Sequence, residues 1–106
     1  MAKYLLIADY TLEGTRGLLK EGGSARREAG AKLASSVGGK LEAFYFSFGG
    51  DDAYVIIDVP DNVSAAAVSL VVAAGGGARL RTVVLLTPEE IDQAAKKTPQ
   101  YRAPGA

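Results

Sequence analysis

The residues whose side chains could do chemistry gather on a predicted hairpin near the middle of the chain. They are hydroxyls and carboxylates, joined by one arginine from a later strand: Tyr45, Ser47, Asp52, Tyr54, Asp58 and Arg81. A carboxylate whose pKa is raised by burial can act as a general base, and a phenol or guanidinium group can stabilise an oxyanion. Asp52 and Asp58 are the candidate bases, and all six residues are candidate ligand-binding groups. The two aspartates stand at opposite ends of one strand, roughly 20 Å apart, so they cannot form a carboxylate pair within one chain, although they could across a two-fold axis.

The composition excludes several other kinds of chemistry. The 106 residues contain neither Cys nor His, which removes thiol nucleophiles, Ser-His-Asp triads and the commonest transition-metal ligands, so we predict no metal site and no cofactor. Twelve Lys plus Arg balance twelve Asp plus Glu, and this neutrality argues against nucleic acid as a partner. The N-terminal apolar run ends at Asp9, and no window is long enough to span a membrane. We therefore expect a cytoplasmic protein with no membrane partner.

The loop of the hairpin decides which side chains share a face of the sheet. With an even number of loop residues, as the Gly-Gly turn favours, Ser47 faces Asp52 and Tyr45 faces Tyr54. One face of the hairpin is then wholly apolar, and the other carries its hydroxyls and carboxylates. An odd loop would set Glu42 opposite another carboxylate, and like charges repel. We therefore predict the even loop.

The wider sequence predicts the elements that position these residues. Hydrophobic patterns, caps and glycines predict strands over 3–10, 40–48, 53–59 and 80–86, and helices over 24–37, 63–74 and 88–97. Ser24 is the expected N-cap of the first helix, and Thr87 to Glu90 reads as a capping box. The segment between the first strand and Ser24 is expected to be a loose connection with at most one helical turn.

This order predicts an α+β fold of the ferredoxin-like type, a βαββαβ antiparallel sheet with two helices on one face and an added C-terminal helix. Residues 1–97 are expected to form a single domain, and residues 98–106 a flexible tail.

Both faces of the predicted sheet are apolar, although two helices can cover only one of them. In the first strand Leu5 and Ile7 have one parity, while Leu6 and Ala8 have the other. We therefore predict a homodimer in which the uncovered sheet faces meet.

The second helix is apolar nearly all round. Its packing stripe is expected to be Val63, Ala67, Leu70, Val71 and Ala74. Val68 and Val72 lie off that stripe, and they either make a further contact in a higher oligomer or are merely exposed.

Several motifs together resemble those of the GYD domain family. They are Lys3 to Thr11, Gly38 to Tyr45, the Gly49-Gly50-Asp51-Asp52 turn, and Asp58 to Asp61. Asp51 stands where the Tyr of the family name would be. The resemblance implies a dimeric α/β barrel of the ferredoxin-like kind, similar to the small monooxygenase and muconolactone isomerase groups, and it implies no established activity.

Two functions remain open from the sequence. The first is a noncatalytic small-molecule-binding or assembly module, in which two sheets enclose a chamber that is mostly apolar with a few polar groups. The alternative is a cofactor-independent isomerase or monooxygenase acting on a small aromatic or enolisable substrate. Arg81 is expected to pair with Asp9 or Asp52 more readily than to clamp a substrate.

Overall fold

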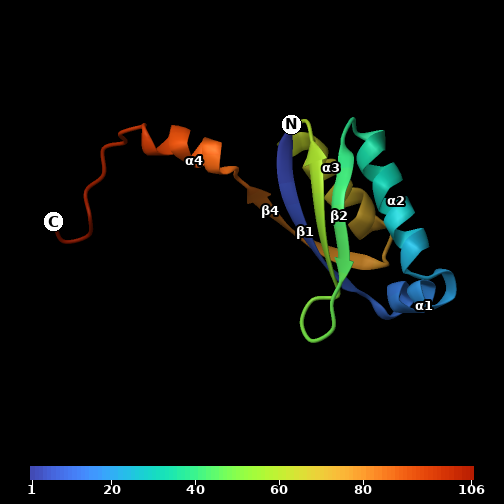
Figure 1. Cartoon of the computed structure of the whole chain (residues 1–106). Coiled ribbons are helices and arrows are strands. Elements are labelled where there is room, and N and C mark those ends of the chain that lie inside the picture. Colours follow the sequence, from blue (N-terminus) through green and yellow to red (C-terminus); the bar gives the residue numbers. More distant parts are fainter.

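A computed structural model describes all of residues 1–106 and contains four strands and four helices (Figure 1). The strands are β1 (Ala2–Tyr10), β2 (Lys40–Phe46), β3 (Ala53–Val59) and β4 (Ala78–Leu85), and the helices are α1 (Leu12–Glu21), α2 (Gly23–Ser36), α3 (Asn62–Ala74) and α4 (Pro88–Ala95). The strands form one antiparallel sheet in the order β2-β3-β1-β4. The predicted α+β class and antiparallel sheet are confirmed, and the element order matches the ferredoxin-like one apart from an extra helix before α2.

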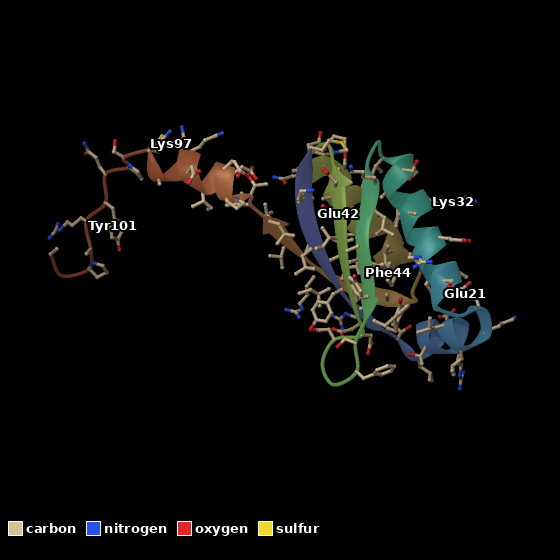
Figure 2. All side chains as sticks on the ribbon, in the orientation of Figure 1. Glu21, Lys32, Glu42, Phe44, Lys97 and Tyr101 are labelled. Atoms are coloured by element: carbon tan, nitrogen blue, oxygen red, sulfur yellow. The ribbon has the colours of Figure 1, made fainter.

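The hairpin register is the one that the even loop predicts. Tyr45 pairs with Tyr54, and the Ser47 amide donates a 2.9 Å hydrogen bond to the carbonyl oxygen of Asp52. The apolar parity of the hairpin therefore lies under the helices, as expected. Figure 2 shows Phe44 on the side of β2 that faces α2, where its ring lies 3.5 Å from the place a Cβ would take at Gly30.

The core lies between this face of the sheet and helices α2 and α3. Its buried members come from β1, β3 and the two helices: Tyr4, Leu6, Ala34, Val55, Ile57, Val59, Ala65 and Val68. Odd-numbered residues of β1 point the other way, and no helix of the chain lies across them (Figure 1). We call this second side of the sheet the open face, and its apolar centre consists of Leu5, Ile7, Ala43, Ile56, Val83 and Leu85.

Helix α1 corrects the expectation of a loose connection after the first strand. Thr11 caps the helix by accepting a hydrogen bond from the Gly14 amide at 3.1 Å, and its own amide donates to the Gly77 carbonyl at 3.0 Å. The helix continues to Glu21, and Gly22 alone joins it to α2 with a φ of 84°. That left-handed conformation suits glycine, which lets the two helices meet at a sharp corner. The predicted Ser24 cap is therefore wrong, because α2 begins at Gly23 with no side-chain cap.

Helix α3 has the predicted bounds within one residue but packs through a different stripe. Ala65 and Val68 are buried and Val72 packs against the core, whereas Val63, Leu70 and Val71 are exposed. The predicted packing stripe is wrong at these positions. A helix that is apolar nearly all round gives no sequence signal for which side will dock.

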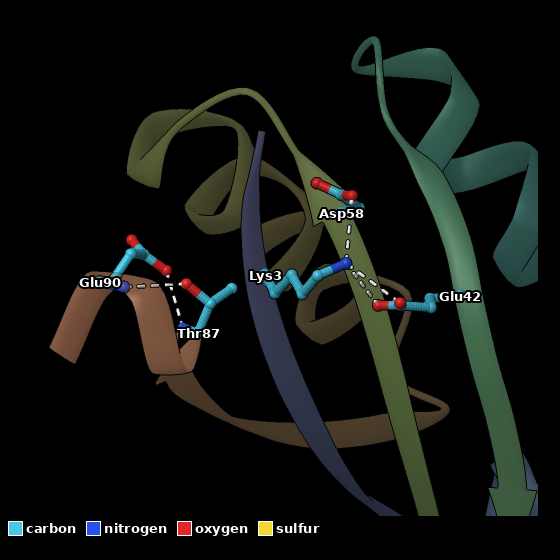
Figure 3. A network of polar contacts seen from close by, with 5 residues as sticks. All are labelled: Lys3, Glu42, Asp58, Thr87 and Glu90. Atoms are coloured by element: carbon cyan, nitrogen blue, oxygen red, sulfur yellow. Dashed lines mark hydrogen bonds and ion pairs between the residues drawn. The ribbon is translucent and has the colours of Figure 1, made fainter. Parts of the chain in front are cut away.

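Helix α4 begins at the predicted capping box, in which Thr87 and Glu90 bond to each other's backbone amides (Figure 3). It projects from the end of β4 away from the sheet, and all of its residues are exposed. Lys97 and Tyr101 lie farther out along the same arm (Figure 2). None of the four helices has both the length and the apolar character needed to cross a membrane.

Candidate functional site

Five of the six predicted site residues lie together where the hairpin loop meets the open face. Tyr45 and Tyr54 are paired across β2 and β3, and Arg81 and Tyr54 flank Ile7 from the two neighbours of β1. Asp52 lies at the base of the loop, next to Ser47. Tyr45 is 72% exposed and Tyr54 is 36% exposed, so both phenols are accessible from the open face.

Asp52 holds the loop onto the sheet. Its carboxylate accepts a 2.8 Å hydrogen bond from the Tyr10 amide, and its own amide donates at 2.9 Å to the Ala8 carbonyl oxygen. The structure therefore gives Asp52 an anchoring role that the sequence analysis did not foresee.

Arg81 forms an ion pair with Asp51 at 2.8 Å. The predicted partner is wrong, because Arg81 pairs with Asp51 instead of Asp9 or Asp52. Asp51, which stands where the family motif has Tyr, thus supplies the counter-charge of Arg81. The arginine remains 63% exposed, so the pair closes the loop end without being sealed from solvent.

Asp9 is a residue at this end of the sheet that the sequence analysis considered only as a partner of Arg81. Its pKa is raised above the ordinary 3.8, first by a hydrogen bond with the Asp51 carboxyl, then by partial desolvation and the nearby charges of Asp51 and Asp52, while Arg81 opposes the rise. The signal was present in the sequence, because an even loop and an antiparallel neighbour place Asp9 beside Asp52. We call Asp9, Asp51, Asp52 and Arg81 the turn-end cluster.

The carboxylates of the turn-end cluster are not arranged to hold a metal ion. No group of three or more acidic side chains in the chain has that arrangement. Its donors and acceptors lie beside the two accessible phenols, Tyr45 and Tyr54. The arrangement therefore suits a small ligand with hydrogen-bonding groups at one end.

Asp58 lies at the opposite end of the open face, away from the turn-end cluster. Lys3 bridges it to Glu42, with its ammonium 3.0 Å from the Glu42 carboxylate and 3.4 Å from Asp58 Oδ2 (Figure 3). These contacts, the Glu42 hydrogen bond foremost, raise the pKa of Lys3. Asp58 is only 9% exposed, and its Oδ1 atom has no hydrogen-bond donor within the chain.

A β-bulge explains how Glu42 reaches this end. Leu41 pairs with Ile57 while Ala43 pairs with Ile56, so Glu42 is the extra residue of β2. The sequence argument had excluded a register that set Glu42 against Asp58. The register is correct, yet the bulge still brings the two carboxylates to the same lysine, and Lys3 offsets their repulsion.

The fold and these sites place the protein among small α+β proteins with one antiparallel sheet, helices on one face, and polar groups at both ends of an otherwise apolar open face. The family model of the GYD domain matches residues 4–95, so the chain belongs to the GYD domain family. No curated protein and no solved structure matches the sequence.

Proposed function

We propose that the protein is a homodimeric small-molecule-binding module in which two open faces meet as a dimeric α/β barrel. The observation that carries this proposal is the apolar centre of the open face, which no element of the chain covers. The chamber between the two sheets would be walled by Leu, Ile and Val and closed at its ends by the polar groups described above. A mostly apolar pocket with a few convergent polar groups is typical of a small-molecule site.

The exposure of the open face supports a second copy as its cover. Val83 is 41% exposed, and Leu5, Ile56 and Leu85 are half-buried. Burial of apolar area stabilises by about 25 cal/mol per Å², so covering this patch on two chains favours association. A two-fold contact places the same patch on both chains, and an apolar patch complements itself.

Helix α4 adds to the argument for a partner. Its eight residues form a helix that touches little of its own chain, and Ile91 is 51% exposed. A helix of this length is marginal in water without packing, even with a capping box. The arm extends beyond the edge of the sheet, where a second copy on the open face would offer it a surface.

We expect a noncatalytic role because the two candidate bases are already engaged. Asp52 accepts from the Tyr10 amide, and Asp58 is paired with Lys3 at the far end of the sheet. Tyr45, Ser47, Tyr54 and Arg81 then act as ligand-binding groups, with Asp52 and Asp58 as the polar ends of the chamber.

The association is tested by placing one charge on the open face. Val83→Glu would bury a carboxylate in a dry interface once per chain, which costs several kcal/mol, so the dimer dissociation constant should rise at least ~100-fold. Val63→Glu is the matched control, because Val63 is 78% exposed on α3 and faces away from the sheet. Sedimentation velocity measures the association of both variants. A wild-type monomer at micromolar concentration would refute the proposal, and dissociation by Val63→Glu alone would move the interface to α3.

The ligand is tested by native mass spectrometry of the purified dimer. A retained small molecule should leave on dissociation by Val83→Glu. If the dimer carries no small molecule from any extract, the binding role is refuted and the protein is an assembly module without a chamber ligand.

The alternative, a cofactor-independent isomerase or monooxygenase for a small aromatic or enolisable substrate, is favoured by one observation. Asp9 holds its proton to a higher pH than an ordinary aspartate, as a general base near neutrality must. Proton NMR of phenylpyruvate in deuterated buffer tests it. α-Proton exchange that the wild-type protein accelerates and Asp9→Asn does not would favour the enzyme, and exchange at the buffer rate would exclude this proton-abstraction chemistry for the probe.

A further inference from the structure

A cavity of about 80 Å³ lies on the covered side of the sheet, between it and helices α2 and α3. Thirteen of its fifteen lining residues are hydrophobic. The cavity exists because small residues face one another there: Gly30 and Ala34 from α2, and Ala8, Ala53 and Ala78 from the sheet. Protein interiors normally fill such space, because each empty region loses packing contacts.

A second, more polar cavity of about 300 Å³ adjoins the first. Tyr10, Arg26, Val72 and Ala78 line both cavities, so they form the passage between them. The outer wall of the second cavity comes from α1 and from the glycine turn that follows α3. A ligand could therefore enter past α1 and place its apolar end between α2 and α3.

Arg26 supplies the polar recognition at this passage. Its Nη1 donates to Glu21 Oε1 at 3.2 Å, and its remaining donors have no partner within the chain. A guanidinium group carries five N–H donors in a planar fork that suits a carboxylate. The Tyr10 hydroxyl, on the same passage, also has no hydrogen-bond partner in the chain.

We infer that this passage and cavity form a binding site for a small hydrophobic carboxylate. The carboxylate lies against the free edge of Arg26, and a short branched alkyl group fills the inner cavity. That cavity is smaller than the roughly 150 Å³ that accepts benzene in an engineered protein, so an alkyl group fits it better than a whole ring. All lining residues belong to one chain and lie on the side of the sheet away from the open face, so the site does not depend on the proposed dimer.

The test uses 4-isopropylbenzoate and its neutral analogue 4-isopropylbenzamide, titrated into ¹⁵N-labelled full-length protein and followed by NMR. Both probes should shift amide signals of α2 and α3. Arg26→Met should raise the dissociation constant of the benzoate about tenfold, because a charge-assisted pair is lost. The dissociation constant of the benzamide should stay within a few-fold of its wild-type value. Glu21→Gln should strengthen binding of the benzoate, because it removes the carboxylate that competes for Arg26.

The cavity itself is tested by filling it. Ala34→Leu should abolish binding of both probes while the protein keeps its far-UV circular dichroism. Gly30→Ala is the milder variant, because its added Cβ would lie at an ordinary 3.5 Å from Phe44, and it should weaken both probes. Unchanged affinity in Gly30→Ala and in a folded Ala34→Leu would overturn the inference, and so would equal losses of both probes in Arg26→Met.

A further variant separates this site from the chamber of the proposed function. Val83→Glu, on the open face, should leave both dissociation constants unchanged even where it breaks the dimer. Loss of probe binding in Val83→Glu would place the probes between the sheets and overturn the inference. Retained binding in a monomer would support it even if the proposed dimer fails.

Discussion

Substituting alanine for Gly14 should destabilise the protein, although alanine is the better helix former. An added Cβ at Gly14 would lie 1.8 Å from the Gly77 carbonyl oxygen and 2.7 Å from its carbon, far inside contact distance. Helix α1 must then move away from the turn that follows α3. That movement breaks the 3.0 Å bond from the Thr11 amide to Gly77 and the 2.8 Å bond from the Thr11 hydroxyl to Gly76.

The magnitude follows from these losses and from a matched control in the same helix. Each hydrogen bond contributes about 1 kcal/mol net, while alanine in a helix gains at most about 1 kcal/mol over glycine. Gly14→Ala should therefore lose about 1–2 kcal/mol. Gly17→Ala meets nothing within 4 Å and should gain about 0.5–1 kcal/mol. The two variants should differ by about 2 kcal/mol, or roughly 10 °C in melting temperature for a domain of this size.

Thermal unfolding followed by circular dichroism at 222 nm measures the difference. Wild type and both variants must be compared at one protein concentration, because association raises the melting temperature. A Gly14→Ala protein that melts at or above the wild-type temperature would show that α1 does not dock through Thr11 and the glycine turn. It would also remove the outer wall from the cavity that Arg26 serves.

Three other changes test separate parts of the structure. Asp9→Asn should be more stable than wild type at pH 7 and should lose that advantage as the pH falls toward 3.8. The reason is that a carboxyl group whose pKa is raised in the native state lowers the stability only when it is ionised. Urea unfolding at a series of pH values measures the difference. Thr87→Ala should lower the helical dichroism but leave the melting temperature of a monomeric sample unchanged, since α4 projects from the body. Lys3→Met should lower the free energy of unfolding at neutral pH, measured by urea unfolding, because it leaves the nearly buried Asp58 carboxylate without its cationic partner.

The sheet and its register were predictable because local rules decide them. The two-glycine turn and the repulsion between carboxylates favoured an even loop, and β3 has the predicted bounds of Ala53–Val59. Alternation along β3 then assigned its apolar side to the helices. The bulge at Glu42 was not predictable, because it is coupled to Lys3 of the neighbouring strand β1, whose ammonium group donates to two carboxylates at once.

The helices were harder because tertiary contacts override their local signals. Gly17, Gly22 and Gly23 argued for a loose connection, yet residues 12–21 form a helix in which Gly14 is required by the close approach of Gly77. A sequence cannot show a contact between residues so far apart along the chain. The docking side of α3 was not predicted because alanines and valines of the helix lie on all of its sides.

The positions of the candidate residues were predictable in part for the same physical reasons, while their role as a site stays a prediction. Register correctly placed Tyr45 beside Tyr54 on the open face, and Asp52 next to Ser47 at the loop end. The partner of Arg81 and the raised pKa of Asp9 depend on how the loop folds back, which brings Asp51 over the sheet. Spacing alone could therefore place the cluster without assigning which carboxylate binds the arginine.

The two proposed sites are linked by the alternation of β3. Ala53, Val55 and Ile57 line the cavity beneath the helices, whereas Tyr54 and Ile56 lie on the open face between them in sequence. A one-residue slip of the hairpin would exchange these sets, and would place tyrosine in the cavity and alanine on the proposed interface. One register thus sets both surfaces. Substitutions at odd positions of β3 should therefore change ligand affinity, and those at even positions should change association.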